Sequence, residues 1–344
     1  MKKLLIVLIT SSLIFSCQNQ KTNKREKQKQ VTTVTDENYA LAETQIIIEG
    51  YVKKIAAATN TNGVGVFMHN KTAADPKDRT IMRINFDTFY SFAVLDLEED
   101  AILTMPETNE RYQSAWVISE EHYNPGAFNK PGEHIITKEW VGTRYVVIVM
   151  RTQVNVNDPE DIKKANALQD KLELTQKKKS SYVPSHNWDM DEILAMRAKY
   201  MEIGNNMSTS DMFGKKGEVP LINHNAGTAY GWGGFTPDQA VYPGYFPTST
   251  EHQTLTLKDV PVKAFWSITV YDNEGFPQTD TYNINSAFAN TDKDGSVTIN
   301  FGGDKKSENY METFEGWNFT LRLYQPTAEY FNGTWTKPEL IPVK

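Results

Sequence analysis

The stretch AFWSITVYD, Ala264–Asp272, constrains the fold of this chain more than any other. Side chains of an extended strand alternate between two faces, so one face carries Trp266 and Val270 and the other Phe265 and Tyr271. Large apolar residues on both faces predict a strand that is covered on both sides. This pattern favours a sandwich of sheets over a sheet with one open face.

The length of the chain predicts more than one core. Its 344 residues exceed what a single compact core holds and fit two domains of ordinary size. The net charge is -7 and the folded part has no basic stripe, which argues against nucleic acid as a partner.

The N-terminus has the pattern of a bacterial lipoprotein signal. Lys2 and Lys3 precede the apolar run Leu4–Ile14, which is too short to span a bilayer comfortably, and Cys17 follows, the single cysteine of the chain. We therefore expect residues 1–17 to be a signal peptide ending at an acylated Cys17, which would tether the protein to a bacterial membrane on its periplasmic or surface side. The alternative is a buried cysteine in an uncleaved anchor.

The residues after this signal divide into four predicted segments. Residues 18–35 contain a run without apolar side chains, QNQKTNKREKQKQ, which predicts a disordered stalk. We expect an N-terminal β domain over 36–157, a helical connection over 158–206 and a C-terminal β-sandwich over 207–344. The fold class is thus mainly β with some α.

Local patterns predict three helices and a series of short strands. The helices are expected over Asp36–Ala58, after Asp158 as a cap, and over Asp189–Asn206, with a linker near residues 177–181. The strand signals occur at Ile81–Ile84, Phe92–Leu97, Leu103–Met105, Ala115–Ser119, His134–Thr137, Arg144–Thr152, Thr254–Leu257, Ala264–Tyr271, Ser296–Phe301 and Trp317–Tyr324. Gly227–Tyr245, rich in glycine and aromatic residues, is expected to be a loop.

Two motifs carry a resemblance to a known bacterial family. Asn85–Asp96, NFDTFYSFAVLD, resembles the N-x-D-T-x-Y-S signature of the domain of unknown function 1254 (DUF1254). Ala264–Asp272 and Asn318–Pro338, with L-R-L-Y-x-P, G-T-W and P in order, resemble its usual companion, the domain of unknown function 1214 (DUF1214). The resemblance implies two β-sandwiches of Greek-key or jelly-roll type joined by helical segments, and it carries no established activity.

The first motif contains the candidate catalytic residues. Asp87 is a candidate base, Tyr90 a donor, and Arg111 a fork that would recognise an anion. Asn85 and Tyr112, beside them in sequence, are candidate ligand-binding residues. We expect Asn85, Asp87, Tyr90 and Arg111 to converge on one water-accessible cavity. The structural alternative is a self-bonded turn with Arg111 paired to Asp87.

The second domain offers candidate ligand-binding residues of a different kind. Arg322 lies between two leucines in a strand, so it faces solvent, a carboxylate or the domain interface if the leucines face the core. Trp232, Tyr271 and Tyr282 are candidates for an aromatic surface of the kind that stacks on sugar rings. The alternative is that these aromatic side chains are core residues.

Motifs for metals, cofactors and nucleophilic catalysis are missing from the sequence. The six histidines form no H-x-H or H-E-x-x-H pair, so no metal site and no cofactor are predicted. There is no G-x-S-x-G motif and no phosphate-binding loop.

Two functional classes follow. The first is a binding or surface-assembly module of the cell envelope for a small polar ligand, a glycan or a protein. The second is a hydrolase or lyase that uses Asp87 as base and Arg111 as an anion clamp. Whether the protein is an enzyme, which ligand it takes and whether it forms a homo-oligomer are left open by the sequence.

Overall fold

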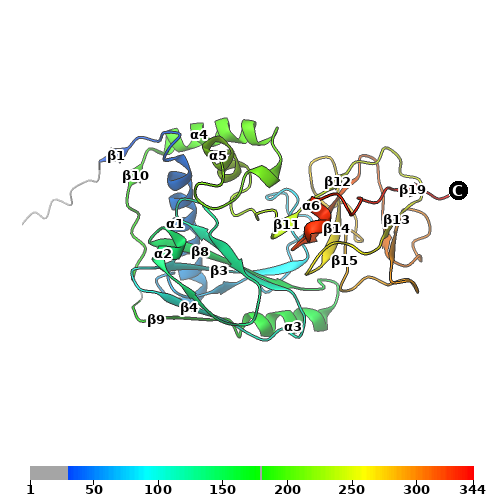
Figure 1. Cartoon of the computed structure of the whole chain (residues 1–344), viewed down its shortest axis with the longest axis horizontal. Helices are drawn as coiled ribbons and strands as arrows, with labels where there is room; N and C mark the ends of the chain where they lie inside the picture. Colours follow the sequence, from blue (N-terminus) through cyan, green and yellow to red (C-terminus); the bar gives the residue numbers. More distant parts are fainter. Residues whose placement is uncertain (1–29, 179) are drawn as a thin grey trace, which may run out of the picture.

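A computed structural model describes residues 30–178 and 180–344 as two β-sandwiches with a layer of helices against the first (Figure 1). The mainly β architecture with some α agrees with the prediction from sequence. The predicted signal peptide, most of the predicted stalk and Cys17 lie outside the described residues. Within the described residues, no helix is long and apolar enough to cross a bilayer.

The N-terminal sandwich consists of two antiparallel sheets. The larger sheet has the order β2-β3-β8-β5-β6 and the smaller sheet the order β7-β4-β9. Their bounds are β2 Met68–His69, β3 Thr88–Asp96, β4 Ala101–Met105, β5 Gln113–Ser119, β6 Gly126–Phe128, β7 Gly132–Ile136, β8 Tyr145–Gln153 and β9 Glu173–Gln176. Alternate residues of β8 divide between two cores: Val146 and Ile148 face the smaller sheet, and Val147 and Val149 face the opposite side.

The C-terminal sandwich also has two sheets around one core. In the first, β18 pairs with β11, β12 and β14, and β14 pairs with β15; the second has the order β17-β16-β13-β19. Their bounds are β11 Ala240–Val241, β12 Gly244–Tyr245, β13 Gln253–Leu257, β14 Trp266–Tyr271, β15 Asn283–Asn285, β16 Val297–Phe301, β17 Tyr310–Met311, β18 Asn318–Tyr324 and β19 Ile341–Pro342. Apolar side chains from both sheets fill the space between them.

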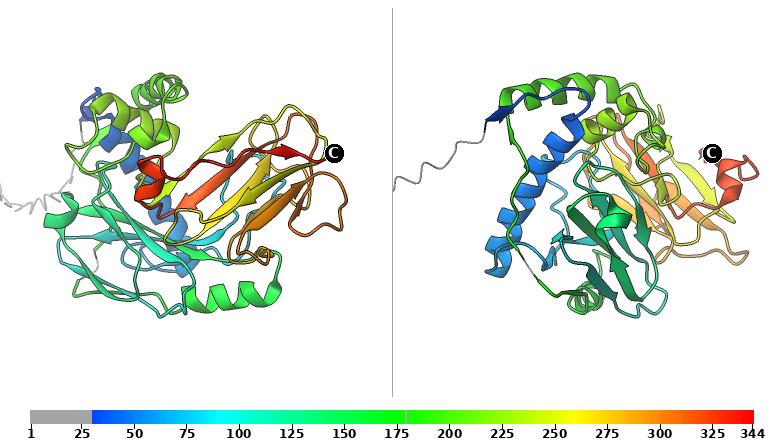
Figure 2. Two further views of the ribbon diagram at one scale, coloured as in Figure 1. Left: turned by 45° about the vertical axis from the view of Figure 1, so that its right-hand side comes forward. Right: turned by 60° about the vertical axis from the view of Figure 1, so that its left-hand side comes forward.

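The helices lie mostly on the outer face of the larger N-terminal sheet (Figure 2). The long helix α1 packs on β3, while α4 and α5 pack on each other and on α1. The helix bounds are α1 Tyr39–Thr59, α2 Lys138–Val141, α3 Pro159–Gln169, α4 Met190–Gly204, the 3₁₀ turn η1 Thr209–Asp211, α5 Leu221–Tyr230 and α6 Ala328–Phe331; β1 Val31–Thr32 pairs with β10 Asn187–Trp188.

Strand β14 confirms the expectation drawn from Ala264–Asp272. All six of its residues are buried. Trp266, Ile268 and Val270 belong to the core of the C-terminal sandwich. The opposite face is covered by the N-terminal domain, with which Ser267 and Tyr271 form hydrogen bonds.

Some local predictions are confirmed and others are wrong. Asp158 and Asp189 cap α3 and α4 as expected. Asp36 does not cap α1; its carboxylate accepts a hydrogen bond from Tyr200 instead, because α4 packs beside the start of α1. Ile81–Ile84 is a turn rather than a strand, and the expected loop Gly227–Tyr245 begins inside helix α5.

Candidate functional site

The two domains meet along a polar seam. Along β14, β15 and β18, apolar residues that face the core of the C-terminal sandwich alternate with polar residues that face the N-terminal domain. These polar residues are Ser267, Thr269, Asn283 and Arg322. The N-terminal side of the seam is the segment 83–90, which leads into β3. The predicted site motif therefore lies at the domain interface.

Asp87 lies fully buried in this seam and finds its partners in the other domain. Its carboxylate accepts hydrogen bonds from the Ser267 hydroxyl at 2.5 Å, the Asn283 amide at 2.9 Å and the Tyr324 hydroxyl at 3.2 Å. These donors come from β14, β15 and β18. Asn85 joins the group, since its amide nitrogen donates to the Tyr324 hydroxyl at 2.9 Å.

Arg322 forms the second half of the same network. Its guanidinium donates to the hydroxyls of Thr269 at 2.7 Å and Tyr271 at 2.6 Å, and to the backbone carbonyl of Arg83 at 3.0 Å. Asn283 donates to the Thr269 hydroxyl at 3.0 Å as well as to Asp87, and so links the two halves. Burial opposes the charge of Arg322, but the neighbouring tyrosines and Asp87 raise the pKa of its guanidinium above the ordinary value.

Arg111 does not reach Asp87. It pairs with Asp161 of α3 through two hydrogen bonds, at 2.5 and 2.9 Å, and donates to the Gln153 carbonyl at 2.7 Å. Burial opposes ionisation of Asp161, yet the hydrogen bonds from Arg111 and from the Asn155 backbone keep the pKa of this carboxyl below its ordinary value. The pairing of Arg111 with Asp87, which the structural alternative suggested, is therefore wrong, because Arg111 pairs with a residue 50 positions along the chain.

The expected single cavity is not formed. Asn85 and Tyr90 line a cavity of about 400 Å³ beside residues 69–74, whereas Arg111 and Tyr112 line a different one of about 680 Å³. Asp87 is fully enclosed. Tyr90 accepts a long hydrogen bond, 3.4 Å, from Arg151.

The predicted aromatic surface is also divided. Tyr271 is fully buried in the seam, and Tyr282 packs edge-on against Phe86 there, with ring centroids 4.7 Å apart. Trp232 lies in the helical layer, where its indole nitrogen donates to Thr44 at 3.1 Å. These three side chains therefore do not form one platform.

An open groove lies between the domains on the Arg111 side. It encloses about 680 Å³ and shares the loop 107–111 and Gln153 with a neighbouring hollow of about 620 Å³. The C-terminal domain contributes residues 263–265, 286–287 and Gln325 to its lining. The groove therefore has walls from both sandwiches.

Three amide side chains that line this groove each have a polar atom without a partner. They are the Oε1 atom of Gln113, the Nε2 atom of Gln153 and the Oδ1 atom of Asn129, all buried and unbonded among the described residues. Such atoms are rare because each costs free energy when buried without a hydrogen bond. These residues are not among those predicted from the sequence, although the polar side chains of Gln113 and Gln153 at the ends of the apolar strands β5 and β8 are a signal for two of them.

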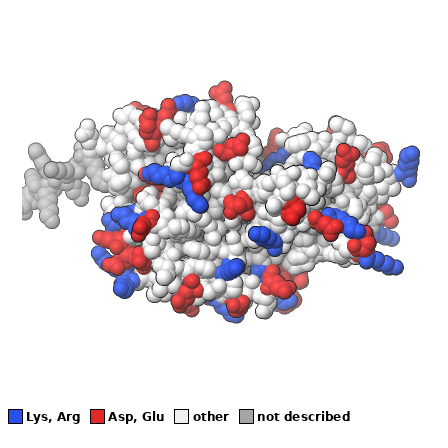
Figure 3. Space-filling view, in the orientation of Figure 1, with Lys and Arg blue, Asp and Glu red and all other residues white. Residues whose placement is uncertain are grey.

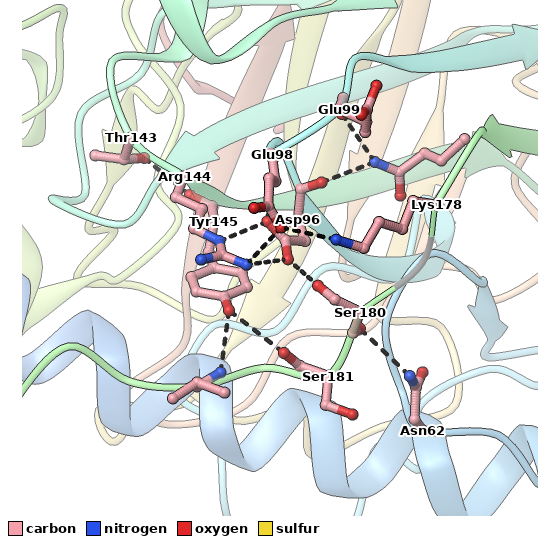
Figure 4. A network of polar contacts seen from close by, with 12 residues as sticks. Asn62, Asp96, Glu98, Glu99, Thr143, Arg144, Tyr145, Lys178, Ser180 and Ser181 are labelled. Carbon is pink, nitrogen blue, oxygen red and sulfur yellow. Dashed lines mark hydrogen bonds and ion pairs between the residues drawn. The ribbon is translucent and has the colours of Figure 1, made fainter.

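A separate charged network on the N-terminal sandwich holds the chain after β9 (Figure 4). Arg144 donates to both carboxylate oxygens of Asp96, at 2.7 and 2.8 Å, and to Glu98 at 3.2 Å, while Ser180 also donates to Asp96. Burial opposes ionisation of Asp96, but these hydrogen bonds hold the pKa of its carboxyl below the ordinary value. Every carboxylate oxygen of Asp96 has a donor, so this network fixes the predicted linker in place.

The face shown in Figure 3 carries acidic and basic side chains side by side.

Among residues 30–178 and 180–344, no group of three or more histidine, cysteine, aspartate and glutamate side chains is arranged to hold a metal ion.

Comparisons with known proteins agree with the two motifs. Residues 64–176 match the family described as Protein of unknown function (DUF1254), and residues 247–328 match Protein of unknown function (DUF1214). No curated protein matches the chain.

One solved structure shares the fold, and a second matches more weakly. The VPA0106 protein from Vibrio parahaemolyticus is similar over 90% of this chain and 100% of its own, with 18% identity and a TM-score of 0.62. An uncharacterized protein from Burkholderia cenocepacia matches over 90% of this chain and 88% of its own, with 11% identity and a TM-score of 0.49. With its two matched segments in tandem, the chain belongs to the bacterial family that combines a DUF1254 domain with a DUF1214 domain.

Proposed function

We propose that this protein is an exported lipoprotein that binds a small polar ligand in the groove between its two domains. The observation that carries the proposal is the set of unpartnered amide atoms on Gln113, Gln153 and Asn129 in the groove lining. Two of these atoms are acceptors and one is a donor. A ligand with several hydroxyl groups, such as a sugar, can both donate and accept, which suits a lining with unpaired atoms of both kinds.

The position of the groove supports this reading. Clefts between two domains are common ligand sites because both walls can contribute contacts. Phe265 and Tyr112 line the groove, and their ring centroids lie 5.2 Å apart. Both rings are buried, so they give this part of the groove a rigid apolar wall.

The enzymatic alternative with Asp87 as base has less support. Both oxygens of this carboxylate already accept hydrogen bonds, and the residue is fully buried. A general base must reach the proton that it takes from a substrate. Arg111, the proposed anion clamp of that alternative, is committed to Asp161.

The groove is tested by filling it. Ala287 lines the groove and its neighbouring hollow and is exposed, so Ala287→Trp occupies the space without removing a contact of the core. The full chain is titrated with a panel of neutral mono- and disaccharides, and binding is followed by calorimetry and by the shift in Tm. We expect at least one sugar to bind the wild type and to lose tenfold or more in affinity in Ala287→Trp.

Ala58→Trp serves as the matched control, because Ala58 is an exposed residue of α1 outside the groove. It should bind as the wild type does. Equal binding by Ala287→Trp, or no binding by any sugar of the panel, would contradict the proposed site.

The lipid anchor is tested independently of the groove. We expect Cys17→Ser to abolish incorporation of labelled palmitate and to move the protein from the membrane fraction to the soluble fraction. A variant that keeps its label and its membrane association would show that Cys17 is not the acylated residue.

A further inference from the structure

Arg151, near the polar seam between the domains, is a buried cation without a carboxylate partner. It lies on β8 beside Tyr90 of β3 and Ser114 of β5, which are its direct neighbours in the antiparallel register. The three side chains form a polar row across the larger sheet, on the face toward the C-terminal domain. The neighbouring row, Phe92 with Val149 and Trp116, is apolar.

The contacts of Arg151 do not neutralise it. The residue is 8% exposed, and its single hydrogen bond among the described residues runs from Nε to the Tyr90 hydroxyl at 3.4 Å. Its Nη1 atom is buried without a partner. The guanidinium lies over the ring of Phe235, 3.6 Å from the centroid, which offsets only part of the cost of burying a charge.

Three other arginines of the chain are treated differently. Arg111, Arg144 and Arg197 each form an ion pair with a buried carboxylate, those of Asp161, Asp96 and Glu43. For Arg151, no carboxylate lies within 4.0 Å among the described residues. A buried cation that is left without a carboxylate is costly and needs a reason.

The surroundings of Arg151 are tyrosine hydroxyls. Those of Tyr90, Tyr112 and Tyr242 lie within electrostatic reach of its guanidinium. Tyr242 is also within reach of Arg322, so two cations act on its hydroxyl. Tyr242 keeps 40% of its surface accessible to water, while burial of its hydroxyl raises the pKa of this group, and the hydroxyl makes no hydrogen bond with the described residues.

We propose that Arg151 and Tyr242 bind the oxyanion of a small organic molecule, a carboxylate or a phosphate. A guanidinium stacked on an aromatic ring keeps its N–H edge free for an acceptor in its plane, and carboxylates and phosphates match that edge with two oxygens. The Tyr242 hydroxyl supplies a further donor. Arg322 contributes positive potential from the opposite domain, and the ligand supplies the negative charge that the protein lacks here.

This site is distinct from the groove of the proposed function. Tyr112 lines the groove, but its hydroxyl donates to Ser114 at 2.9 Å, on the row of Arg151. Its ring packs against those of Phe265 and Tyr324, with centroids 5.2 and 5.6 Å away. These rings separate the two places, so one can bind its ligand when the other does not.

The test is titration of the full chain with inorganic phosphate, with benzoate and with neutral benzyl alcohol, followed by calorimetry. We expect at least one of the two oxyanions to bind saturably and benzyl alcohol not to bind. Arg151→Met should weaken that binding at least tenfold, and Tyr242→Phe, which removes only a hydroxyl, about threefold to tenfold. Binding that is strongest for phosphate or for benzoate identifies which oxyanion the site prefers.

Arg79→Met is the matched control. Arg79 is exposed, stacks on Phe276 at 4.8 Å and forms no ion pair among the described residues, so only its position differs. It should leave the affinity unchanged. The proposal is overturned if neither oxyanion binds, or if Arg151→Met and Tyr242→Phe bind as tightly as the wild type does.

Discussion

Asp87 and Arg151 are both buried charges near the interface of the two domains, but the protein treats them in opposite ways. Asp87 accepts hydrogen bonds from three side chains of the other domain and is connected to Arg322 by three hydrogen bonds in series, through Asn283 and Thr269. Arg151 has one long hydrogen bond and an unpaired Nη1 atom. The first charge is satisfied by the protein itself, and the second is not.

This difference separates structure from recognition within one interface. The motif N-x-D-T-x-Y-S suggests a catalytic role for its aspartate, but Asp87 forms hydrogen bonds that join the two domains. Arg151 lies within an apolar strand and was not predicted as a site residue, but it is the buried charge that lacks a partner. Substitutions of Asp87 and Arg151 should therefore change the free energy of unfolding by different amounts.

The largest effect is expected for Asp87→Ala. The substitution leaves donors on Ser267, Asn283 and Tyr324 unpaired, so the free energy of unfolding should fall by about 4 kcal/mol. Asp87→Asn keeps the shape and one acceptor, and should cost about half as much. Urea unfolding measures both; a loss under 1 kcal/mol for Asp87→Ala would show that the network does not hold the domains together.

Arg322→Met should have the next largest effect. It removes three hydrogen bonds and the positive charge that balances Asp87, and we expect a loss of about 3 kcal/mol. Arg79→Met, at an exposed position of the same domain boundary, should change stability by less than about 0.5 kcal/mol. Similar losses in the two variants would remove the distinction between a satisfied buried charge and an exposed one.

Two buried histidines, His122 and His224, destabilise the folded protein only at acidic pH, where protonation would place a charge in the interior. Burial lowers the pKa of His224 to about 4, and burial together with His224 lowers that of His122. Because the pKa of His224 is lower in the folded protein than in the unfolded chain, its contribution is complete above pH 6.5 and is lost as the pH falls toward 4. The folded protein should lose about 2 kcal/mol between pH 8 and pH 5 through this residue.

His224→Gln isolates this contribution. Glutamine can still donate to the Glu121 carbonyl, to which the His224 ring is bonded at 2.9 Å, but it does not titrate. The difference in unfolding free energy between pH 8 and pH 5 should therefore be smaller in the variant. Identical differences would mean that His224 is not buried as a neutral ring.

Among the buried charges, the smallest effect is expected for Arg151→Met in the absence of ligand. The variant loses the contact with the Phe235 ring but no ion pair, and it relieves a buried charge, so stability should stay within about 1 kcal/mol of the wild type. A loss above 2 kcal/mol in urea unfolding would show that Arg151 is as structural as Arg322.

The sequence was sufficient to predict features that depend on neighbours along the chain. The two faces of β14, the caps Asp158 and Asp189, and the orientation of Arg322 away from its flanking leucines all follow from alternation and local capping. The partners across the domains did not follow. Asp87 meets Ser267 180 positions away, and no local pattern encodes that pairing.

The candidate site was predicted less completely for the same reason. Asn85 and Asp87 do lie together, but the partner of Arg111 comes from α3. Gln113, Gln153 and Arg151 were missed because a polar residue at a strand position gains meaning only from what lies opposite. Whether such a residue is satisfied depends on tertiary contacts that alternation does not specify.

The backbone conformation of Arg83 depends on contacts with the C-terminal half of the protein. Its φ of 51° is unusual for a large side chain, and its amide, carbonyl and guanidinium all bond to the C-terminal half. A fragment that ends before the second sandwich would contain the Arg83 turn and the Asp87 carboxylate without their hydrogen-bond partners. Each half has its own core, but both lose these contacts when they are separated, so we expect each half alone to be less stable than it is in the intact chain.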